Sequence, residues 1–355
     1  MKALVLSGGA GTRLRPFSHS MPKQLIPVAN KPVLEHVLEN IRDLGITDVG
    51  VVVGDWGPEI GEVIGDGTRV GVRITYIQQE SPLGLAHCVA IARPFLGDDD
   101  FVLYLGDNML PAGITDIAEK FTRARPAAHI VVHKVPDPRS FGVAELDADG
   151  HVVRLVEKPA HPRSDLALIG VYFFTAAIHT AVDAIEASAR GELEITDAIQ
   201  WLVTHGHDVR AGEHTGYWKD TGRAEDVLDC NRRLLDGLTA RVHGDVDASS
   251  RLSGQVVVEA GASVVRSRIE GPVIIGAGTV VEDSRIGPGT SIGRNCVVRD
   301  TRLSDSIVMD GASITMVPGL RGSLIGRNSA VGTGSEGAAD HRLVVGDDTR
   351  IEVAA

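Results

Sequence analysis

Cysteines and long apolar runs are both scarce in this sequence. Its three cysteines, Cys88, Cys230 and Cys296, are odd in number and have no C-x-x-C spacing, so they predict reduced thiols and no disulfide framework. No apolar run approaches the roughly eighteen residues that cross a membrane, and the chain begins with a strand pattern, Lys2-Ala3-Leu4, instead of a signal peptide. We therefore predict a cytoplasmic protein with no membrane partner.

Basic residues are in the minority. The chain of 355 residues has 35 Lys and Arg against 47 Asp and Glu, which gives a net charge of -12. Surfaces that bind nucleic acid are normally basic, so this balance argues against a nucleic-acid partner. A nucleotide substrate remains compatible with it, because such a ligand needs only local cations.

Two common phosphate-binding motifs are also missing. No G-x-x-x-x-G-K-[ST] occurs, and Leu14 stands where a G-x-G-x-x-G run from Gly9 would need its third glycine. The sequence therefore predicts neither a Walker nucleotide-binding loop nor a dehydrogenase-type dinucleotide site.

The chain does have a glycine-rich turn directly after its first strand. Gly8, Gly9 and Gly11 follow the apolar strand, and two cations come next, Arg13 and then Lys23. Glycines let backbone N–H groups approach a polyphosphate closely, because no Cβ stands in the way. We predict a phosphate-binding loop with two cations beside it; the alternative is a glycine-rich turn that serves geometry alone.

The length predicts two domains. In residues 1–238, β-rich runs alternate with helical patterns, of which the clearest covers 33–44 and ends at Gly45. This order predicts an α/β domain with a Rossmann-like, mostly parallel sheet whose ligands bind at the carboxyl ends of the strands. The expected strands are 49–53, 72–77, 101–105 and 130–135, with a hairpin of 141–146 and 151–156.

Residues 239–355 follow a different period, with an apolar residue at about every sixth position. This spacing predicts a left-handed parallel β-helix of hexapeptide repeats, interrupted by a loop near 332–342 before a last rung at 343–353. An ordinary sandwich of short strands is the alternative. An open coil end favours a homo-oligomer. The apolar positions are Val258, Val264, Ile269, Ile275, Val281, Ile286, Ile292, Val298, Leu303, Val308 and Ile314.

Two carboxylates follow predicted strands. Asp107 comes directly after the buried strand 101–105, and Asp220 follows a short aromatic strand. Oxygen ligands from two carboxylates and a triphosphate suit Mg²⁺, so we expect a magnesium site. Taken alone, Asp107 is equally compatible with a turn residue and Asp220 with a helix N-cap.

Three further segments suit a phosphorylated substrate. The run from Gln78 to Ala86 offers polar side chains for a base edge, although a plain loop fits it too. Glu157 and Lys158 pair a carboxylate for sugar hydroxyls with a cation for a phosphate, and the alternative is a surface ion pair. Arg190 precedes 191–197, which we expect to open a helix; these residues add ligand contacts or form a solvated helix start.

In this order the motifs resemble those of the sugar-1-phosphate nucleotidylyltransferases, and among them most closely the long-form glucose-1-phosphate thymidylyltransferases, which carry a hexapeptide β-helix and act in deoxysugar pathways. The resemblance covers residues 1 to about 235. The motifs are G-G-A-G-T-R-L-x-P, P-K-Q-L, Q-x-x-P-x-G-L-A, G-D-N, F-G-V, E-K-P, G-E-L-E-I-T-D and W-K-D-T-G.

The resemblance implies a role for each matching residue, with dTTP and glucose-1-phosphate as substrates and Mg²⁺ as cofactor. The nucleotide would contact Leu6, Gly8, Gly9, Gly11, Thr12, Arg13, Gln79, Pro82, Gly84 and Asp107. The sugar phosphate would contact Asn108, Gly142, Glu157, Lys158, Gly170, Arg190 and Trp218. Catalysis would rest on Arg13, Lys23, Asp107, Lys158 and Asp220, with the two aspartates on the metal. Lys219 before the second aspartate supports the long form, and Phe141 stands where many members have tyrosine.

Alternatives remain open at this point. The nucleotide could be UTP, GTP or ATP, and the acceptor a cyclitol phosphate or another sugar phosphate. A non-catalytic regulatory subunit is disfavoured because Arg13, Lys23, Asp107, Lys158 and Asp220 are all present. An acetyltransferase site in the coil is disfavoured because no histidine-rich or basic site stands out in 250–330.

Overall fold

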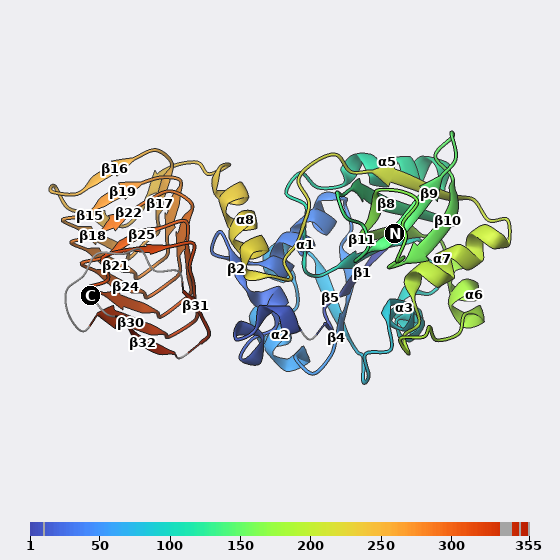
Figure 1. Cartoon of the computed structure of the whole chain (residues 1–355), viewed down its shortest axis with the longest axis horizontal. Coiled ribbons are helices and arrows are strands. Elements are labelled where there is room, and N and C mark those ends of the chain that lie inside the picture. The colour runs from blue at the N-terminus through green and yellow to red at the C-terminus, as the bar shows by residue number, and fades with distance from the viewer. Residues whose placement is uncertain (10, 334–342, 348, 354–355) are drawn as a thin grey trace. The chain divides into compact units, whose positions relative to one another are not determined.

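The computed structural model describes residues 1–9, 11–333, 343–347 and 349–353, which group into two compact units (Figure 1). Unit 1 comprises Met1–Gly9 and Leu34–Asp220, and unit 2 comprises Ala10–Val33 and Thr221–Ala355. Each unit therefore draws on two stretches of the chain. The predicted domain boundary at residue 238 stays a prediction.

Unit 1 is built on a nine-stranded sheet whose path runs β10-β9-β11-β6-β1-β4-β5, with β8 and β12 joined to it through β11. The strands β6, β1, β4 and β5 are mutually parallel, as the predicted fold class requires. The bounds are β1 (Lys2–Leu6), β4 (Asp48–Val53), β5 (Arg73–Gln78), β6 (Phe101–Leu105), β8 (Ala128–Lys134), β9 (Gly142–Leu146), β10 (Val152–Glu157), β11 (Leu166–Phe174) and β12 (Val209–Glu213).

The long strand β11 was not predicted. It runs antiparallel to β6, β8 and β9, so it joins the parallel strands to the hairpin β9–β10. Eight of its nine residues are buried. A strand buried on both faces lacks the polar-apolar alternation by which a half-exposed strand is found in a sequence.

Helices cover both faces of this sheet. On one face, α3 (Leu85–Ile91), α6 (Ala177–Ala184) and α7 (Ile195–Thr204) pack over Phe101 and Leu103 of β6. On the other face, the hydroxyl of Tyr104 accepts a hydrogen bond from Asn40 of α1 (Val33–Asp43) at 3.2 Å. The remaining helices of the unit are α2 (Gly57–Ile64), α4 (Arg93–Leu96), α5 (Thr115–Ala124) and the short η4 (Thr68–Val70).

Unit 2 contains the predicted parallel β-helix, with three parallel sheets that run along the coil. The turns from Val258 to Ile275 and from Ile275 to Ile292 each take 17 residues. The next turn, from Ile292 to Val308, takes 16. All eleven apolar residues that the period singled out lie in the core of the coil, so this prediction is confirmed. Most five-residue intervals lie between the second and third sheets, between Val264 and Ile269 for example, and a further one, from Leu303 to Val308, accounts for the 16-residue turn.

The strands of the three sheets are short. The first sheet has β14 (Arg241–Val242), β17 (Val256–Val258), β20 (Val273–Ile275), β23 (Thr290–Ile292), β26 (Ile307–Val308), β29 (Leu324–Ile325) and β31 (Val344–Val345). The second has β15 (Asp245–Val246), β18 (Ser263–Val265), β21 (Val280–Glu282), β24 (Val297–Arg299), β27 (Ser313–Thr315), β30 (Ala330–Thr333) and β32 (Arg350–Val353). The third has β16 (Arg251–Ser253), β19 (Arg268–Glu270), β22 (Arg285–Ile286), β25 (Arg302–Ser304) and β28 (Leu320–Arg321). Of the predicted loop near 332–342, residues 334–342 lie outside the described residues.

A buried asparagine ties the rest of unit 2 to the coil. Asn231 of α8 (Ala224–Leu235) is fully buried, and its Oδ1 accepts hydrogen bonds from Ala29 N–H at 2.9 Å and from the Ser291 hydroxyl at 2.7 Å. Its Nδ2 donates to the Gly289 carbonyl at 3.0 Å. Both the amide oxygen and the amide nitrogen of Asn231 are therefore hydrogen-bonded within unit 2. The short segments near Ala29 are η1 (Thr12–Leu14), η2 (Phe17–His19), η3 (Lys23–Leu25), β2 (Pro27–Val28) and β3 (Lys31–Pro32).

Candidate active site

The ends of β1 and β6 bring the start of the glycine-rich turn beside Asp107. Leu6, the last residue of β1, is buried and pairs with Leu105, the last residue of β6. Gly106 then donates its N–H to the Leu6 carbonyl at 2.9 Å. The two chains that leave these strands, Ser7-Gly8-Gly9 and Gly106-Asp107, therefore start side by side, and Asp107 is largely buried there.

Gln79, the predicted base-reading residue, lies against this turn. A Cβ on Gly8 would be 3.2 Å from Gln79 Oε1, so the absence of a side chain makes room for the amide. Gln79 Nε2 donates to the Gly84 carbonyl at 3.4 Å and to His87 Nδ1 at 3.0 Å. Both contacts hold the amide nitrogen and leave the amide oxygen on the side of Gly8.

His87 was not singled out from the sequence. It lies in the first turn of α3, which begins at Leu85, and its ring contacts Gln79 across eight residues of chain. A lone histidine at the start of a helix has no distinctive spacing, so the sequence carries no clear signal for this contact. The one sequence feature that indicates this contact is the predicted start of a helix after the turn, because a residue in the first turn of that helix can face back toward Gln79.

The turn itself is fixed by backbone contacts. Gly84 has φ +105°, and a Cβ there would be 2.4 Å from the Leu193 carbonyl oxygen. Leu193 donates its N–H to the Leu83 carbonyl at 2.7 Å, and Ala86 donates to the Leu193 carbonyl at 3.0 Å. Pro82, also predicted to contact the nucleotide, is exposed in the same turn. The chain before α7 thus supports the predicted base-reading turn.

Asp107 and Asp220 reach the same part of unit 1. The two-residue strand β7 (Asn108–Met109) begins directly after Asp107 and pairs antiparallel with β13 (Lys219–Asp220), which places Asp220 opposite Asn108. Two carboxylates at one sheet edge supply the oxygen ligands that a hard divalent cation needs. The donor set therefore fits the metal that the sequence predicts.

Asn108 lies against both Trp218 and Gly170. The Trp218 Nε1–H donates to Asn108 Oδ1 at 3.0 Å, and a Cβ on Gly170 would be 2.4 Å from Asn108 Nδ2. Trp218 also meets the ring of Phe141 edge-on, with ring centroids 5.6 Å apart. Because Gly142 follows Phe141, this contact connects the group to the hairpin β9–β10.

Glu157 is the centre of a second group, formed with Gly142, Lys158 and Arg190. Its Oε1 lies 3.5 Å from Lys158 Nζ and 3.7 Å from Arg190 Nη2. Its Oε2 accepts a hydrogen bond from the Thr196 hydroxyl at 3.3 Å and lies 3.3 Å from where a Gly142 Cβ would be. The structure therefore brings these predicted sugar-phosphate residues together.

Arg190 is already engaged by acidic neighbours. Its guanidinium donates to Glu194 Oε1 from Nη2 at 2.8 Å and from Nε at 3.0 Å, and Glu192 lies 3.3 Å away. These hydrogen bonds with Glu194 raise the pKa of Arg190 above its ordinary value. The helix that 191–197 was expected to open begins only at Ile195, so Glu192 and Glu194 precede it. A ligand phosphate at Arg190 would share its charge with two carboxylates.

The other predicted loop residues belong to unit 2. Gly11 is left-handed with φ +61°, and a Cβ there would be 3.4 Å from the Cβ of Lys23. Thr12 and Arg13 follow in the single turn η1, closed by the Leu14 N–H on the Gly11 carbonyl at 2.9 Å. Within this unit the structure therefore brings Gly11 and Lys23 together.

A further group of possible metal ligands lies at the turn between β9 and β10. Among the described residues, the carboxylates and ring nitrogens of Asp147, Asp149 and His151 form a cluster whose ligand atoms all lie within 4.8 Å of one another. Asp147 Oδ1 accepts the backbone N–H of Asp149 and of His151, each at 2.9 Å. These bonds give Asp147 a structural role in closing the β9–β10 turn.

In the described part of the chain, no helix is long and apolar enough to cross a membrane.

Comparisons with known proteins agree with this geometry. The family model described as "Nucleotidyl transferase" matches residues 2–237, and that described as "GMPPB C-terminal domain" matches 269–354. Curated glucose-1-phosphate thymidylyltransferases of Streptomyces griseus and Streptomyces antibioticus are 55% and 54% identical, over 100% and 99% of both chains. A crystal structure from Bacillus anthracis, provisionally assigned to the same enzyme, is 31% identical with a TM-score of 0.62, over 68% of this chain and 97% of that one. The chain belongs to the nucleotidyl transferase family and, within it, to the glucose-1-phosphate thymidylyltransferases.

Proposed function

We propose that this protein transfers a thymidylyl group from dTTP to glucose-1-phosphate and releases pyrophosphate, giving dTDP-glucose. The observation that carries the proposal is the identity of 55% with a curated thymidylyltransferase over the whole of both chains. The residues gathered at the carboxyl edge of the unit 1 sheet, together with Arg13 and Lys23 of unit 2, are proposed to supply the chemistry that this reaction needs.

Gln79 is proposed to read the base. Its Nε2 is held by the Gly84 carbonyl and His87, so Oε1 is the atom offered to a ligand. A carbonyl oxygen accepts the N3–H of thymine, whereas the N3 of cytosine is itself an acceptor. This arrangement supports selection of thymine or uracil over cytosine.

Glu157 is proposed to accept the sugar hydroxyls, with Lys158 on the sugar phosphate. Glu157 Oε1 lies 3.5 Å from Lys158 Nζ, so one ligand that carries hydroxyls and a phosphate meets both groups. Asn108, Gly142, Gly170 and Trp218 are proposed to line the sugar, and Arg190 to assist at its phosphate while it stays paired with Glu194.

The reaction needs no general base, because the attacking phosphate oxygen is already an anion. That oxygen forms a bond to the α-phosphorus of dTTP, and the bond from this phosphorus to the pyrophosphate oxygen breaks with its electron pair. Arg13 and Lys23 are proposed to offset the charge on the α-phosphate and the leaving pyrophosphate. The main task is to hold two anions in line.

Enzymes of this family generally use a divalent metal. We propose Mg²⁺, with Asp107 and Asp220 as its protein ligands, because both are oxygen donors at the same sheet edge. When bound, the metal would supply further neutralisation of phosphate charge. A cytoplasmic location and a homo-oligomeric state are also part of the proposal and rest on the sequence.

The test is pyrophosphate release with Mg²⁺ and glucose-1-phosphate, run in parallel with dTTP, UTP, GTP, ATP and CTP. Reactions without sugar phosphate measure simple hydrolysis, and mass spectrometry identifies the nucleotide sugar. We expect the highest kcat/KM with dTTP. Preference for another nucleotide would keep the chemistry and overturn the assigned donor. Release only with a cyclitol phosphate or another sugar phosphate would overturn the acceptor.

A further inference from the structure

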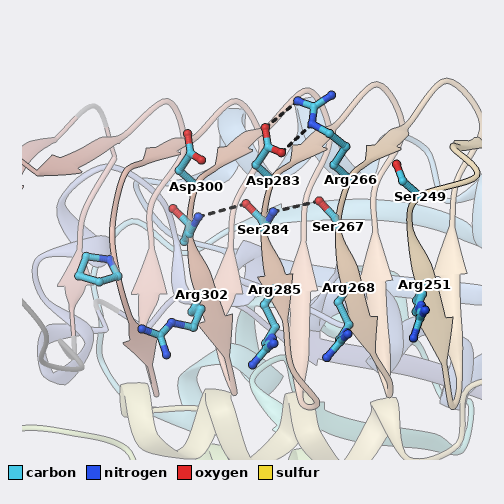
Figure 2. Close-up of a pocket in the computed structure, with 12 residues that line it drawn as sticks. Ser249, Arg251, Arg266, Ser267, Arg268, Asp283, Ser284, Arg285, Asp300 and Arg302 are labelled. Carbon is cyan, nitrogen blue, oxygen red and sulfur yellow. Dashed lines mark hydrogen bonds and ion pairs between the residues drawn. The ribbon is translucent and has the colours of Figure 1, made fainter.

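Four arginines are stacked in register along one face of the β-helix. Arg251, Arg268, Arg285 and Arg302 each begin a strand of the third sheet, and consecutive members are paired between β16, β19, β22 and β25. Figure 2 shows their side chains in one row that point the same way. We name these four residues the arginine ladder.

The ladder concentrates positive charge without counter-ions. Neighbouring strands lie about 4.8 Å apart, so three intervals place four guanidinium groups within roughly 15 Å along the coil. All four residues are exposed, and none of their side chains has a hydrogen bond or ion pair in the described part of the chain. Like charges on adjacent strands repel one another. The arrangement is thus unfavourable on its own, in a chain whose net charge is -12.

Three other arginines of the coil, Arg266, Arg299 and Arg327, are paired with carboxylates. Arg266 forms hydrogen-bonded ion pairs with Asp283 and Glu282, both with contacts of 2.6 Å, and Arg327 pairs with Asp347 at 2.5 Å. Carboxylates are therefore placed to meet arginines elsewhere on this coil. Arg294 and Arg321 are also exposed without a side-chain partner in the described part of the chain, but they are not in register with the ladder. The ladder sets four unpaired arginines in register on adjacent strands, which points to an external anion as the missing partner.

The ladder lines a hollow of about 830 Å³. The hydroxyls of Ser267 and Ser284 also line it, but both are used inside the coil, where they donate to the Val265 and Glu282 carbonyls at 2.7 Å. Asp283 and Asp300 lie along the opposite rim (Figure 2), and Asp283 is occupied by Arg266. The guanidinium groups are thus the main groups that the hollow offers to a ligand.

We propose that the arginine ladder binds a short linear oligophosphate, at a site separate from the proposed reaction. Arginine forms bidentate hydrogen bonds with phosphate oxygens, which lysine does not. Residues 239–355 contain twelve arginines and no lysine. A row of guanidinium groups can contact several phosphates of one linear oligophosphate, whereas a single phosphate ion contacts only one or two of the four arginines. Pyrophosphate and the triphosphate tail of a nucleotide share this chemistry.

The experiment is isothermal titration of the full chain with inorganic tripolyphosphate, without divalent metal and at low salt, because such binding weakens as salt rises. The test variant is Arg268→Gln with Arg285→Gln, which removes the two central rungs. The matched control is Arg294→Gln with Arg321→Gln, which removes the same charge from exposed positions of the same coil. Circular dichroism checks that both variants fold.

We expect the native chain to bind more than one tripolyphosphate. The test variant should lose one site or bind there at least tenfold more weakly, while the control stays within twofold. Pyrophosphate release from dTTP should stay within twofold in both, so a failure of the proposed function would appear separately. Equal binding by native and test variant, or equal losses in both variants, would overturn the proposal.

Two further arms identify the source of the phosphate. If dTTP shows the same dependence on the ladder as tripolyphosphate, nucleotides are supported as ligands; dependence with tripolyphosphate and pyrophosphate alone supports free oligophosphate. An oligoglutamate peptide is the third arm. If the ladder binds this peptide and no oligophosphate, the surface is a contact for an acidic protein and the proposal is wrong.

Discussion

Substitution of Gly84 by alanine tests whether the turn after Gln79 is held as tightly as its contacts indicate. The new Cβ would lie 2.4 Å from the Leu193 carbonyl oxygen and 2.7 Å from the Leu193 nitrogen. Both are backbone atoms, which cannot rotate away as a flexible side chain does. The turn must therefore move from the segment before α7, although two backbone hydrogen bonds hold them together.

The expected cost follows from these contacts. Gly84 has φ +105° and ψ 172°, an extended positive-φ conformation that essentially only glycine adopts, and a residue with a Cβ there costs roughly 1–3 kcal/mol. Weakening the two hydrogen bonds of Leu193 adds about 1 kcal/mol each. We expect Gly84→Ala to lower the free energy of unfolding by about 3–5 kcal/mol, which lowers the melting temperature of a unit of this size by about 10 °C.

Gly206→Ala is the matched control. Gly206 also has a positive φ, +78°, but a Cβ there would meet nothing within 4 Å. Only the backbone strain of roughly 1–2 kcal/mol is then expected. Tryptophan fluorescence is the readout, because Trp56, Trp201 and Trp218 all lie in unit 1. Equal melting temperatures for the two variants would refute the reasoning from the Leu193 contact. Gly84→Ala should also raise the KM for dTTP, since the displaced turn moves the carbonyl of residue 84 away from Gln79 Nε2.

Three other predictions concern separate parts of the chain. Asp107→Asn should lower kcat at least a hundredfold with unchanged circular dichroism, because it removes a proposed metal charge; exposed Asp149→Asn is the control in the same pyrophosphate assay. Asn231→Ala should destabilise unit 2 by about 3 kcal/mol, since it orphans the Ala29 N–H and the Gly289 carbonyl; urea unfolding by circular dichroism should shift while tryptophan fluorescence stays unchanged. Burial, with a smaller effect of Lys120, lowers the pKa of His129 from 6.5 to about 4, so the unfolded chain takes up the proton first. The free energy of unfolding should have its full value above pH 6.5 and fall by about 3 kcal/mol as the pH drops to 4. Urea titrations should show a weaker pH dependence for His129→Gln, whereas the control at an exposed histidine, His161→Gln, should keep the native dependence.

A different result would contradict each of these three predictions. Native turnover by Asp107→Asn would remove this carboxylate from the mechanism. A urea midpoint for Asn231→Ala equal to that of the native chain would mean that the buried amide contributes no net stability. An unchanged slope of stability against pH in His129→Gln would assign the acid sensitivity to other groups.

Much of the fold can be predicted from the sequence because its signals are repetitive or local. The inward residues of the coil, such as Ile275 and Ile292, recur at a fixed spacing, and all the predicted ones are buried. Strand β11 escaped prediction because Leu166–Phe174 is nearly all buried and shows no alternation. The grouping of Ala10–Val33 with unit 2 depends on contacts such as Asn30 Nδ2 with the Ile292 carbonyl at 2.6 Å, across 262 residues of chain.

For the candidate site too, the sequence predicts some features and not others. Asp107 lies two residues beyond the end of β6 and Glu157 is the last residue of β10, so their place at a sheet edge follows from the order of elements. Side-chain partnerships do not follow from it. The hydrogen bond between Gln79 and His87, and the choice of Glu194 as the main partner of Arg190, depend on where α3 and α7 begin.

The constant register of the coil determines how its length can change. Gly276 follows Ile275 and Gly293 follows Ile292, so a cut that removes residues 277–293 joins two equivalent positions and leaves every remaining pairing in place. A cut that does not remove a whole number of turns moves inward residues to outward positions. Each rung also closes a loop of similar short length, so the entropic cost of adding a rung stays nearly constant along the coil. This part of the protein can therefore lengthen or shorten in evolution by whole turns, and each turn gained or lost between Arg251 and Arg302 would change the row of arginines by one.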